Sequence, residues 1–200
     1  MDFKFRFKLG IIIPYLENSE QAKKLWHNLE QNLREQLKHR YDTFIYVVHD
    51  NIEKPKGISY CRNKGIEKLI DLCDYLIFLD SDDDIDSDYI EKMVKATETG
   101  AELLESRFQI LSTEIPFEEH KLKNHITAIA IRSDIIGENR FDETAKFAED
   151  KEFVDRVLDI NKMKKIQVDT VYHYNYGYNP DCISYRYSRG ELWLKRLKWN

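Results

Sequence analysis

The chain has 200 residues, of which 42% are hydrophobic, and a formal net charge of -5 at pH 7. This length predicts one domain of ordinary size with a buried core. Seven glycines and four prolines argue against a fibrous or disordered chain. The net negative charge disfavours non-specific binding to nucleic acid, but it does not exclude a local basic patch.

The three cysteines, Cys61, Cys73 and Cys182, lack a metal-binding spacing such as C-x-x-C. We interpret them as reduced thiols of a cytoplasmic protein. No apolar run approaches the ~20 residues of a membrane span. The first ten residues also lack the apolar segment of a signal peptide. We therefore expect a soluble, cytoplasmic protein.

Strands and helices alternate along the first half of the chain. Apolar runs predict strands at residues 5–15, 43–49 and 75–79, the first closed by Pro14. Apolar residues at steps of three and four predict helices at 18–40, 59–73 and about 88–99. Asn18 with Gln21 resembles a capping box for the first helix, and Ser87 and Gly100 are expected to bound the third. This alternation predicts a parallel sheet with right-handed crossovers.

The second half is less regular. It predicts strands at 101–111, 125–132 and 164–174, a helix at 148–159, and a surface loop near 112–124. The fold class is therefore α/β: a single Rossmann-like domain with a mostly parallel central sheet flanked by helices. Residues 1–111 form its nucleotide-binding half, and the rest adds a small mixed-sheet extension.

The most unusual segment is an aspartate run that follows the apolar residues 75–79. It comprises Asp80, Asp82, Asp83, Asp84, Asp86 and Asp88. Ligands of open α/β sheets bind beyond the carboxyl ends of the strands. Those ends are expected at Pro14-Tyr15, at Asp50 and at Asp80, so the aspartate run lies where a ligand is expected.

Oxygen-rich sites suit hard divalent cations such as Mg²⁺, Mn²⁺ or Ca²⁺. Asp80 and Asp82 can approach one ion, and the phosphates of a nucleotide would complete its coordination. An EF-hand loop is an alternative, but Ile85 stands where that loop requires glycine, and a strand rather than a helix precedes it. Asp86 and Asp88 fit helix-capping charges instead, and Asp84 is left unassigned.

Several segments in order resemble a family 2-type glycosyltransferase of the GT-A fold. The resemblance covers about residues 9–188 and includes a D-x-D motif within the aspartate run. Its segments read IIIPYLENSEQAKKLWHNLEQNL, FIYVVHDN, GISYCRNKGIEKL, YLIFLDSDDDIDSDYIEKMV, RFDETAKFAEDKEFVDRVL and VYHYNYGYNPDCISYRYS. It implies a nucleotide-sugar donor, and it makes residues 112–200 the acceptor-side half and C-terminal tail.

The resemblance also implies roles for single residues on the donor side. Asp50 would contact the nucleotide base, Arg62 the base or diphosphate, and Asp80 the ribose or a metal-bound water. Asp82 would be the direct ligand of Mn²⁺ or Mg²⁺, with Asp83 as the second choice. Donor contacts are further expected from Pro14 and Tyr15 at the end of the first strand. For Arg62, an ordinary surface arginine on a helix is the alternative.

On the acceptor side, the resemblance makes Asp150 the general base, with Glu149 beside it. A family 2 enzyme inverts at the anomeric carbon, and a carboxylate within hydrogen-bond reach can deprotonate the acceptor hydroxyl. The alternative is that these two acids only favour the first turn of a helix through its dipole.

Three residues near the end of the chain complete the expected site. His173 is placed as a further metal or diphosphate contact, with a structural histidine as the alternative. Arg186 and Arg189 are expected in a loop over the diphosphate, which guanidinium groups suit. The last ten residues mix Trp and Leu with Lys and Arg. They suit packing on the domain, nucleic-acid contact, or a peripheral membrane contact that a lipid-linked acceptor would require.

The sequence thus predicts a metal-dependent, inverting glycosyltransferase that moves a sugar from a donor such as a UDP-sugar to an acceptor hydroxyl. Two alternatives stay open: a non-catalytic nucleotide- or metal-binding relative of such enzymes, and a nucleotidyltransferase. The second would normally carry a glycine-rich phosphate loop early in the chain, and residues 11–21 contain no glycine.

Overall fold

The computed structural model describes residues 7–112, 125–145, 148–159 and 162–176. Within them, seven strands form one sheet in the order β2-β1-β3-β6-β5-β7-β4. β1 is parallel to β2 and β3, and β5 is parallel to β7. β6 is antiparallel to β3 and β5, and β4 to β7. The strands are β1 (Leu9–Tyr15), β2 (Thr43–His49), β3 (Tyr75–Phe78), β4 (Asp84–Ile85), β5 (Leu103–Ser112), β6 (Ile129–Arg132) and β7 (Lys165–Tyr176).

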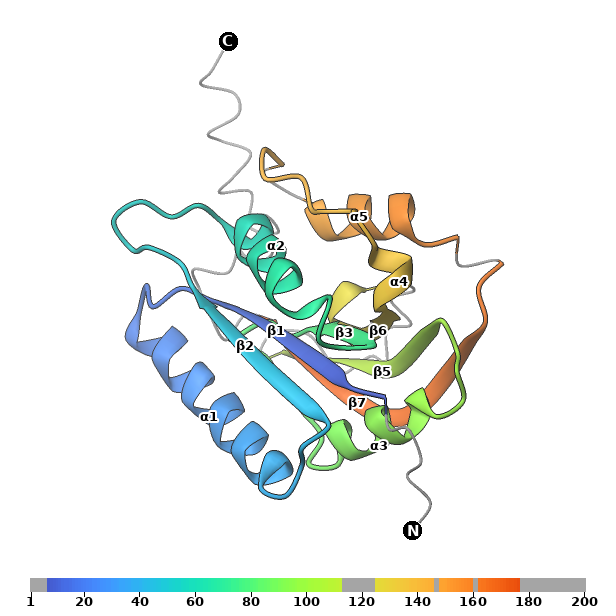
Figure 1. Ribbon diagram of the computed structural model, residues 1–200. Coiled ribbons are helices and arrows are strands. Elements are labelled where there is room, and N and C mark those ends of the chain that lie inside the picture. The colour runs from blue at the N-terminus through green and yellow to red at the C-terminus, as the bar shows by residue number, and fades with distance from the viewer. Residues whose placement is uncertain (1–6, 113–124, 146–147, 160–161, 177–200) are drawn as a thin grey trace.

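Helices cover both faces of this sheet, as Figure 1 shows, with α1 and α3 on one face and α2, α4 and α5 on the other. A 3₁₀ turn, η1 (Ile126–Ala128), leads into β6. The helices are α1 (Glu20–Leu37), α2 (Ile58–Leu69), α3 (Tyr89–Thr97), α4 (Ser133–Ile136) and α5 (Glu149–Val157). The α/β fold class predicted from the sequence is confirmed.

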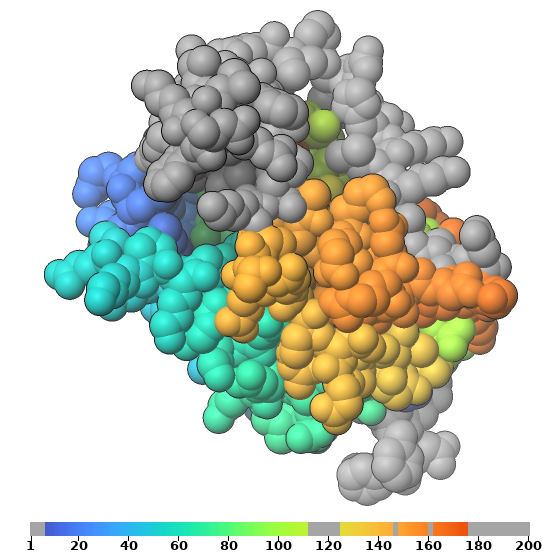
Figure 2. Space-filling model, turned by 90° about the horizontal axis from the view of Figure 1, so that it is seen from above, coloured from blue at the N-terminus to red at the C-terminus, as the bar shows by residue number. Residues whose placement is uncertain are grey.

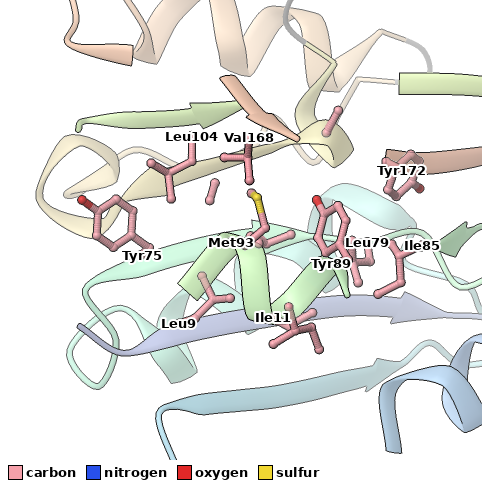
Figure 3. Packing of buried hydrophobic residues seen from close by; sticks show 14 of the residues in the cluster. Leu9, Ile11, Tyr75, Leu79, Ile85, Tyr89, Met93, Leu104, Val168 and Tyr172 are labelled. Carbon is pink, nitrogen blue, oxygen red and sulfur yellow. The ribbon is translucent and has the colours of Figure 1, made fainter. Parts of the chain in front are cut away.

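The two faces have separate hydrophobic cores because alternate residues of a strand point to opposite sides. Ile11 and Ile77 belong to the cluster under α1 and α3, and Figure 3 shows part of this cluster, including Tyr89 and Met93 of α3. Ile12 and Phe78 belong to the cluster under α2, α4 and α5. Residues of α5 pack in this second cluster, which thereby positions the predicted catalytic acids at the start of that helix.

Helix α2 lies unusually close to β1. A Cβ atom added at Gly65 would lie 2.2 Å from Cγ2 and 2.8 Å from Cγ1 of Ile12. Only glycine therefore allows this helix to approach the strand so closely. Arg62 lies one turn earlier on α2, so the close approach of the helix also determines how near Arg62 lies to the sheet.

Most elements lie where the sequence places them, and the differences are local. Pro14 does not close the first strand, because β1 continues to Tyr15 opposite His49. Two predicted caps are wrong: Ser19 caps α1 by accepting from the N–H of Ala22, and Asp88 precedes α3 without a side-chain capping bond. The strand β4 within the aspartate run was not predicted. The predicted loop at 112–124 lies almost entirely outside the described residues.

Candidate active site

The aspartate run is fixed by the last strand, β7. Asp83 is 3% exposed, and its carboxylate accepts from the Tyr172 hydroxyl and from the backbone N–H of Asn175, the latter at 2.8 Å. The Asn175 side chain donates to the backbone carbonyl of Asp82 at 2.8 Å. All three contacts come from residues 89 to 93 positions later in the chain, so β7 determines the conformation of the loop.

The pKa of Asp83 differs from that of an ordinary aspartate. Burial raises the pKa of its carboxyl well above the usual value, and the nearby charges of Asp82 and Asp80 raise it further. Hydrogen bonds from Tyr172 and Asn175 oppose this effect only in part. Both oxygens of Asp83 are engaged by β7, whereas Asp80 and Asp82 are only half-buried.

The second half of the aspartate run is held from both sides of the loop. On one side, α1 contributes Asn32, whose amide donates to Asp84 Oδ1 at 3.0 Å and to the Ile85 carbonyl at 2.7 Å. On the other side, Asp86 accepts from the N–H of Val171 at 2.9 Å. Asp88 occupies the N-cap position of α3, as the capping interpretation predicts, but its side chain makes no capping hydrogen bond, and Asp86 is engaged by β7. Asp88 instead pairs with Lys92 at 2.8 Å and accepts from Thr170 at 3.2 Å.

A buried arginine connects the two acidic segments of the site. Arg62 on α2 is only 2% exposed. Its Nη2 lies 3.0 Å from Asp80 Oδ1, at the end of β3, and its Nη1 lies 3.2 Å from Glu149 Oε1, at the start of α5. The guanidinium also lies 5.3 Å from the ring centroid of Phe141. The surface-arginine alternative is therefore wrong, and the sequence separation of 18 and 87 residues hides this connection.

Burial alone would lower the pKa of Arg62, but the charges of Asp80, Glu149 and Asp150 outweigh it and raise the pKa above the ordinary value. Among the described residues of the site, Arg62 is thus a permanent positive charge between the acids. Asn63, the next residue, accepts from the N–H of Phe141 at 2.8 Å and donates to Glu143 at 2.9 Å. Figure 2 looks onto this face and shows the segment 137–145 lying between α2 and α5.

The two predicted catalytic acids stand at the first two positions of α5. Ala148, just before them, has the left-handed backbone conformation with φ 58°. Burial raises the pKa of Glu149, although Arg62 opposes the shift. Asp150 is more exposed: its Oδ1 accepts from the N–H of Lys151 at 2.7 Å, and its Oδ2 lies 3.8 Å from Nε2 of His125. The two neighbouring acids thus have different environments.

His125 is a residue of this site that sequence reasoning missed. Its Nδ1 lies 2.7 Å from Thr127 Oγ1, and its ring packs 4.8 Å from that of Phe108. The available signal was weak, namely one histidine ahead of an apolar strand. Its neighbourhood depends on the folding of β5, β7 and α5 around it.

The predicted base-contacting residue, Asp50, organises the loop between β2 and α2. It accepts backbone N–H bonds from Asn51 and Lys56 with Oδ1, at 2.8 and 3.0 Å, and from Gly57 with Oδ2 at 2.8 Å. Tyr15 is 5% exposed, packs against Trp26 and His49, and has a pKa raised by burial. Pro14 lies beside Val48 in β2. A donor role of these residues stays a prediction.

His173 lies apart from the D-x-D acids. Its Nε2 is 2.9 Å from Asp86 Oδ1, and it pairs in register with Asp84. In the described part of the chain, no group of three or more His, Cys, Asp or Glu side chains is placed to hold a metal ion. The structure therefore does not bring His173 together with Asp80 and Asp82 as a ligand set.

Two carboxylates remain as candidates for a divalent cation. Asp80 and Asp82 supply hard oxygen ligands, and the charges of both raise the pKa of buried Asp83, which indicates an excess of negative charge in the loop. Mg²⁺ in proteins is typically bound by one or two carboxylates together with substrate phosphates. Asp80 and Asp82 are the residues of the chain that would supply carboxylates to such a cation, and its binding stays a prediction.

Some predicted features fall outside the described residues: Arg186, Arg189, Cys182 and the C-terminal tail. Among the helices that are described, none is both long and apolar enough to cross a membrane.

Several solved structures share this fold. Staphylococcus aureus TarS superposes with a TM-score of 0.66 at 17% identity, over 87% of this chain and 37% of that one. TarS 1–349 in complex with UDP-GlcNAc gives 0.61 at 16% identity, over 84% and 58%. The catalytic domain of Drosophila β1,4-galactosyltransferase 7, in complex with xylobiose, gives 0.55 at 15% identity, over 80% and 64%.

This chain spans 37% to 60% of the length of the TarS structures. No protein-family model matches the sequence, and no curated protein matches it either. At such low identity the likeness establishes the architecture, which is the one that the resemblance in the sequence predicts. The chain therefore has the GT-A fold of the glycosyltransferases that it resembles.

Proposed function

We propose that this protein is an inverting glycosyltransferase that moves a sugar from a nucleoside diphosphate donor to an acceptor hydroxyl. One observation carries the proposal: Arg62 joins Asp80, at the end of β3, to Glu149, at the start of α5. The acids expected to face the donor and those expected to face the acceptor thus meet at one point of a GT-A fold. The TarS complex with UDP-GlcNAc and the galactosyltransferase complex with xylobiose make a UDP-sugar and a carbohydrate the first donor and acceptor classes to test.

Asp150 is the proposed general base because the environments of the two neighbouring acids differ. Glu149 is engaged by Arg62, and burial raises its pKa, which disfavours the ionised form that a base requires. Asp150 is the more exposed of the two. Among the described residues its Oδ2 accepts no hydrogen bond, and Nε2 of His125 lies 3.8 Å from it. A carboxylate in this state can take the proton of an acceptor hydroxyl.

On the donor side, Asp80 and Asp82 would hold a divalent cation, Mn²⁺ or Mg²⁺. When bound, such a cation neutralises the charge that develops on the leaving diphosphate. Arg62 lies beside Asp80 and adds a permanent positive charge in a buried position, where electrostatic stabilisation is strongest. The chain's own contribution is thus to place this charge between the donor and the base.

Product analysis tests the proposal and separates its alternatives. The purified protein would be incubated with nucleotide-sugars, Mn²⁺ and carbohydrate acceptors. Release of nucleoside diphosphate together with a product of inverted anomeric configuration supports transfer. In a second incubation, with a nucleoside triphosphate and a sugar phosphate, release of pyrophosphate would indicate a nucleotidyltransferase. Nucleotide binding in a thermal-shift assay without turnover would indicate a non-catalytic binding protein.

The base assignment has its own test in Asp150→Asn. General base catalysis contributes about 10²- to 10⁴-fold, so we expect kcat to fall by about that factor while donor affinity stays unchanged. Asp155→Asn is a matched control, because Asp155 lies on the same helix in an exposed pair with Lys151. Near-normal transfer by Asp150→Asn would exclude Asp150 as the base.

A further inference from the structure

The imidazole of His125 is held on three sides and faces Asp150 on the fourth. Its Nδ1 lies 2.7 Å from Oγ1 of Thr127, which is fully buried. The ring packs against Phe108 of β5 at 4.8 Å and Tyr174 of β7 at 6.1 Å between centroids. Its Nε2 points to Asp150 Oδ2 at 3.8 Å. The ring cannot turn away from Asp150 without losing these contacts.

The charged groups that face His125 come from three elements: Asp150 from α5, Asp80 from the end of β3, and Arg62 from α2. Burial lowers the pKa of His125, the two carboxylates oppose this, and Arg62 adds to it, so that the pKa lies below its ordinary value. A lowered pKa favours the neutral form of the ring, which carries a single N–H.

The contacts of the ring decide which nitrogen carries that proton. A carboxylate can only accept hydrogen bonds, so the nitrogen that faces Asp150 must be the donor. Nδ1 is then the acceptor, and the Thr127 hydroxyl can donate to it. Thr127 thus selects the tautomer with hydrogen on Nε2, in the way that the partner of one ring nitrogen generally sets the other.

We infer that His125 is a positioning residue for Asp150, which donates its Nε2–H to Oδ2 and holds the carboxylate toward the acceptor hydroxyl. The inference rests on the proposed function, because it assigns His125 to the same reaction. The separation of 3.8 Å is longer than a hydrogen bond. Catalytic hydrogen bonds are often long in the absence of substrate and shorten in the complex, which a small rotation of Asp150 would achieve here.

A titration of His125 by NMR tests the contact without any turnover. The Asp150 carboxylate stabilises the charged ring, so Asp150→Asn should lower the pKa of His125 further. Asp155→Asn should leave this pKa unchanged. Ring nitrogen chemical shifts should report hydrogen on Nε2 in the wild-type protein. An unchanged pKa in Asp150→Asn, or hydrogen on Nδ1, would overturn the inference.

Three substitutions at His125 then test its role in transfer. The amide nitrogen of His125→Gln can occupy the place of Nε2, whereas His125→Asn reaches only the place of Nδ1, and His125→Phe keeps just the ring packing. We expect Gln to retain most of kcat, and Asn and Phe to lose about 10²-fold, the scale of a misplaced catalytic group, with the donor KM unchanged. Equal losses in all three variants at unchanged stability would refute the positioning role.

A double variant separates a shared role from two independent ones. In the Asp150→Asn background, His125→Phe should cause no further loss of kcat, because groups that act as a unit are not additive. Additive losses would contradict the inference. If the wild-type protein transfers no sugar at all, the proposed function fails, but the NMR titration still decides whether His125 and Asp150 interact.

Discussion

The side chain of Arg62 is the positive charge that pairs with acids from two parts of the candidate site. Removing a charge of this kind from water costs several kcal/mol, and the cost is recovered only through well-placed partners. Arg62 has three such partners, since Asp80 and Glu149 bind its two terminal nitrogens and its guanidinium carbon lies over the ring of Phe141. Its position thus depends on the end of β3 and the start of α5 together.

Arg62→Met should destabilise the protein by about 3–5 kcal/mol, because Asp80 and Glu149 would be left partly buried without their partner. The free energy of unfolding in urea measures this loss. Arg34→Met is the control: Arg34 is 74% exposed and pairs with Glu30 on the surface of α1, and such pairs contribute about 0.5 kcal/mol. Equal effects of the two substitutions would show that Arg62 is not a structural link.

Asp83→Asn should change the pH dependence of stability. Because burial raises the folded-state pKa of Asp83 above its ordinary value of 3.8, the folded protein keeps a proton that the unfolded chain releases. The stability of the wild-type protein relative to Asp83→Asn is therefore highest below that value and falls as pH rises toward the folded-state pKa, by at most about 1.4 kcal/mol per pH unit. Urea unfolding across pH, with a chelator present, measures the difference.

An asparagine can accept from the N–H of Asn175 and donate to the Tyr172 oxygen, so it imitates the protonated carboxyl. The control, Asp71→Asn on the exposed surface, should show no such pH trend. A constant difference between wild type and Asp83→Asn across pH would mean that Asp83 is ionised in the folded protein.

At the scale of elements, α2 packs against β1 with less space at Gly65 than is found at any other described glycine. Gly65→Ala should destabilise the protein by about 1–3 kcal/mol, the usual cost of overpacking, although alanine is the better helix former. Ile12→Ala removes both atoms in conflict, at 2.2 and 2.8 Å. The double variant should therefore be more stable than the sum of the two single losses predicts.

Lys68→Ala, on the exposed side of the same helix, is the control and should change stability by less than about 0.5 kcal/mol. Thermal or urea unfolding would serve as the measurement. If Gly65→Ala proved neutral, α2 would have room to move away from the sheet.

The sequence predicts those elements well that have long apolar patterns. The strand at 43–49 has the predicted bounds, because a continuous apolar run with polar neighbours identifies itself. Caps were less predictable, since Asn18 and Ser19 have similar capping propensity and only the path of the chain decides between them. The strand β4 has two residues and forms because Tyr172 and His173 of β7 pair with it. Its local sequence therefore contains no pattern from which a strand could be predicted.

At the scale of the whole molecule, both described cysteines are buried, and Cys73 belongs to the cluster under α2, α4 and α5. Burial raises the pKa of Cys61 to about 12 and that of Cys73 to about 11. In a Cys182→Ser protein, where these two thiols remain, reaction with a thiol reagent at mildly alkaline pH should be slow in the native state. It should be rapid, with two equivalents, in guanidinium chloride. A rapid native reaction would show that one core opens without global unfolding.

The site was predictable in part for the same physical reason as the fold. Acids at the ends of strands and helices, such as Asp80 and Asp150, can be located from the elements that carry them. The partners of these acids cannot, because Arg62, His125 and Tyr172 reach them only after distant segments have packed together. Sequence reasoning thus finds candidate charges, and the tertiary structure shows which of them are neutralised.

The dependence of the aspartate run on β7 also has a consequence for biosynthesis. Asp83 and Tyr172 are 89 residues apart in the chain. At about 5–20 residues per second, a ribosome makes Tyr172 roughly 4 to 18 s after Asp83. During that interval β1, β2 and β3 already exist. The aspartate run follows β3 but lacks its hydrogen bonds to Tyr172 and Asn175. The nascent protein can therefore form three of its seven strands early, whereas the aspartate loop takes its final conformation only when β7 has been made.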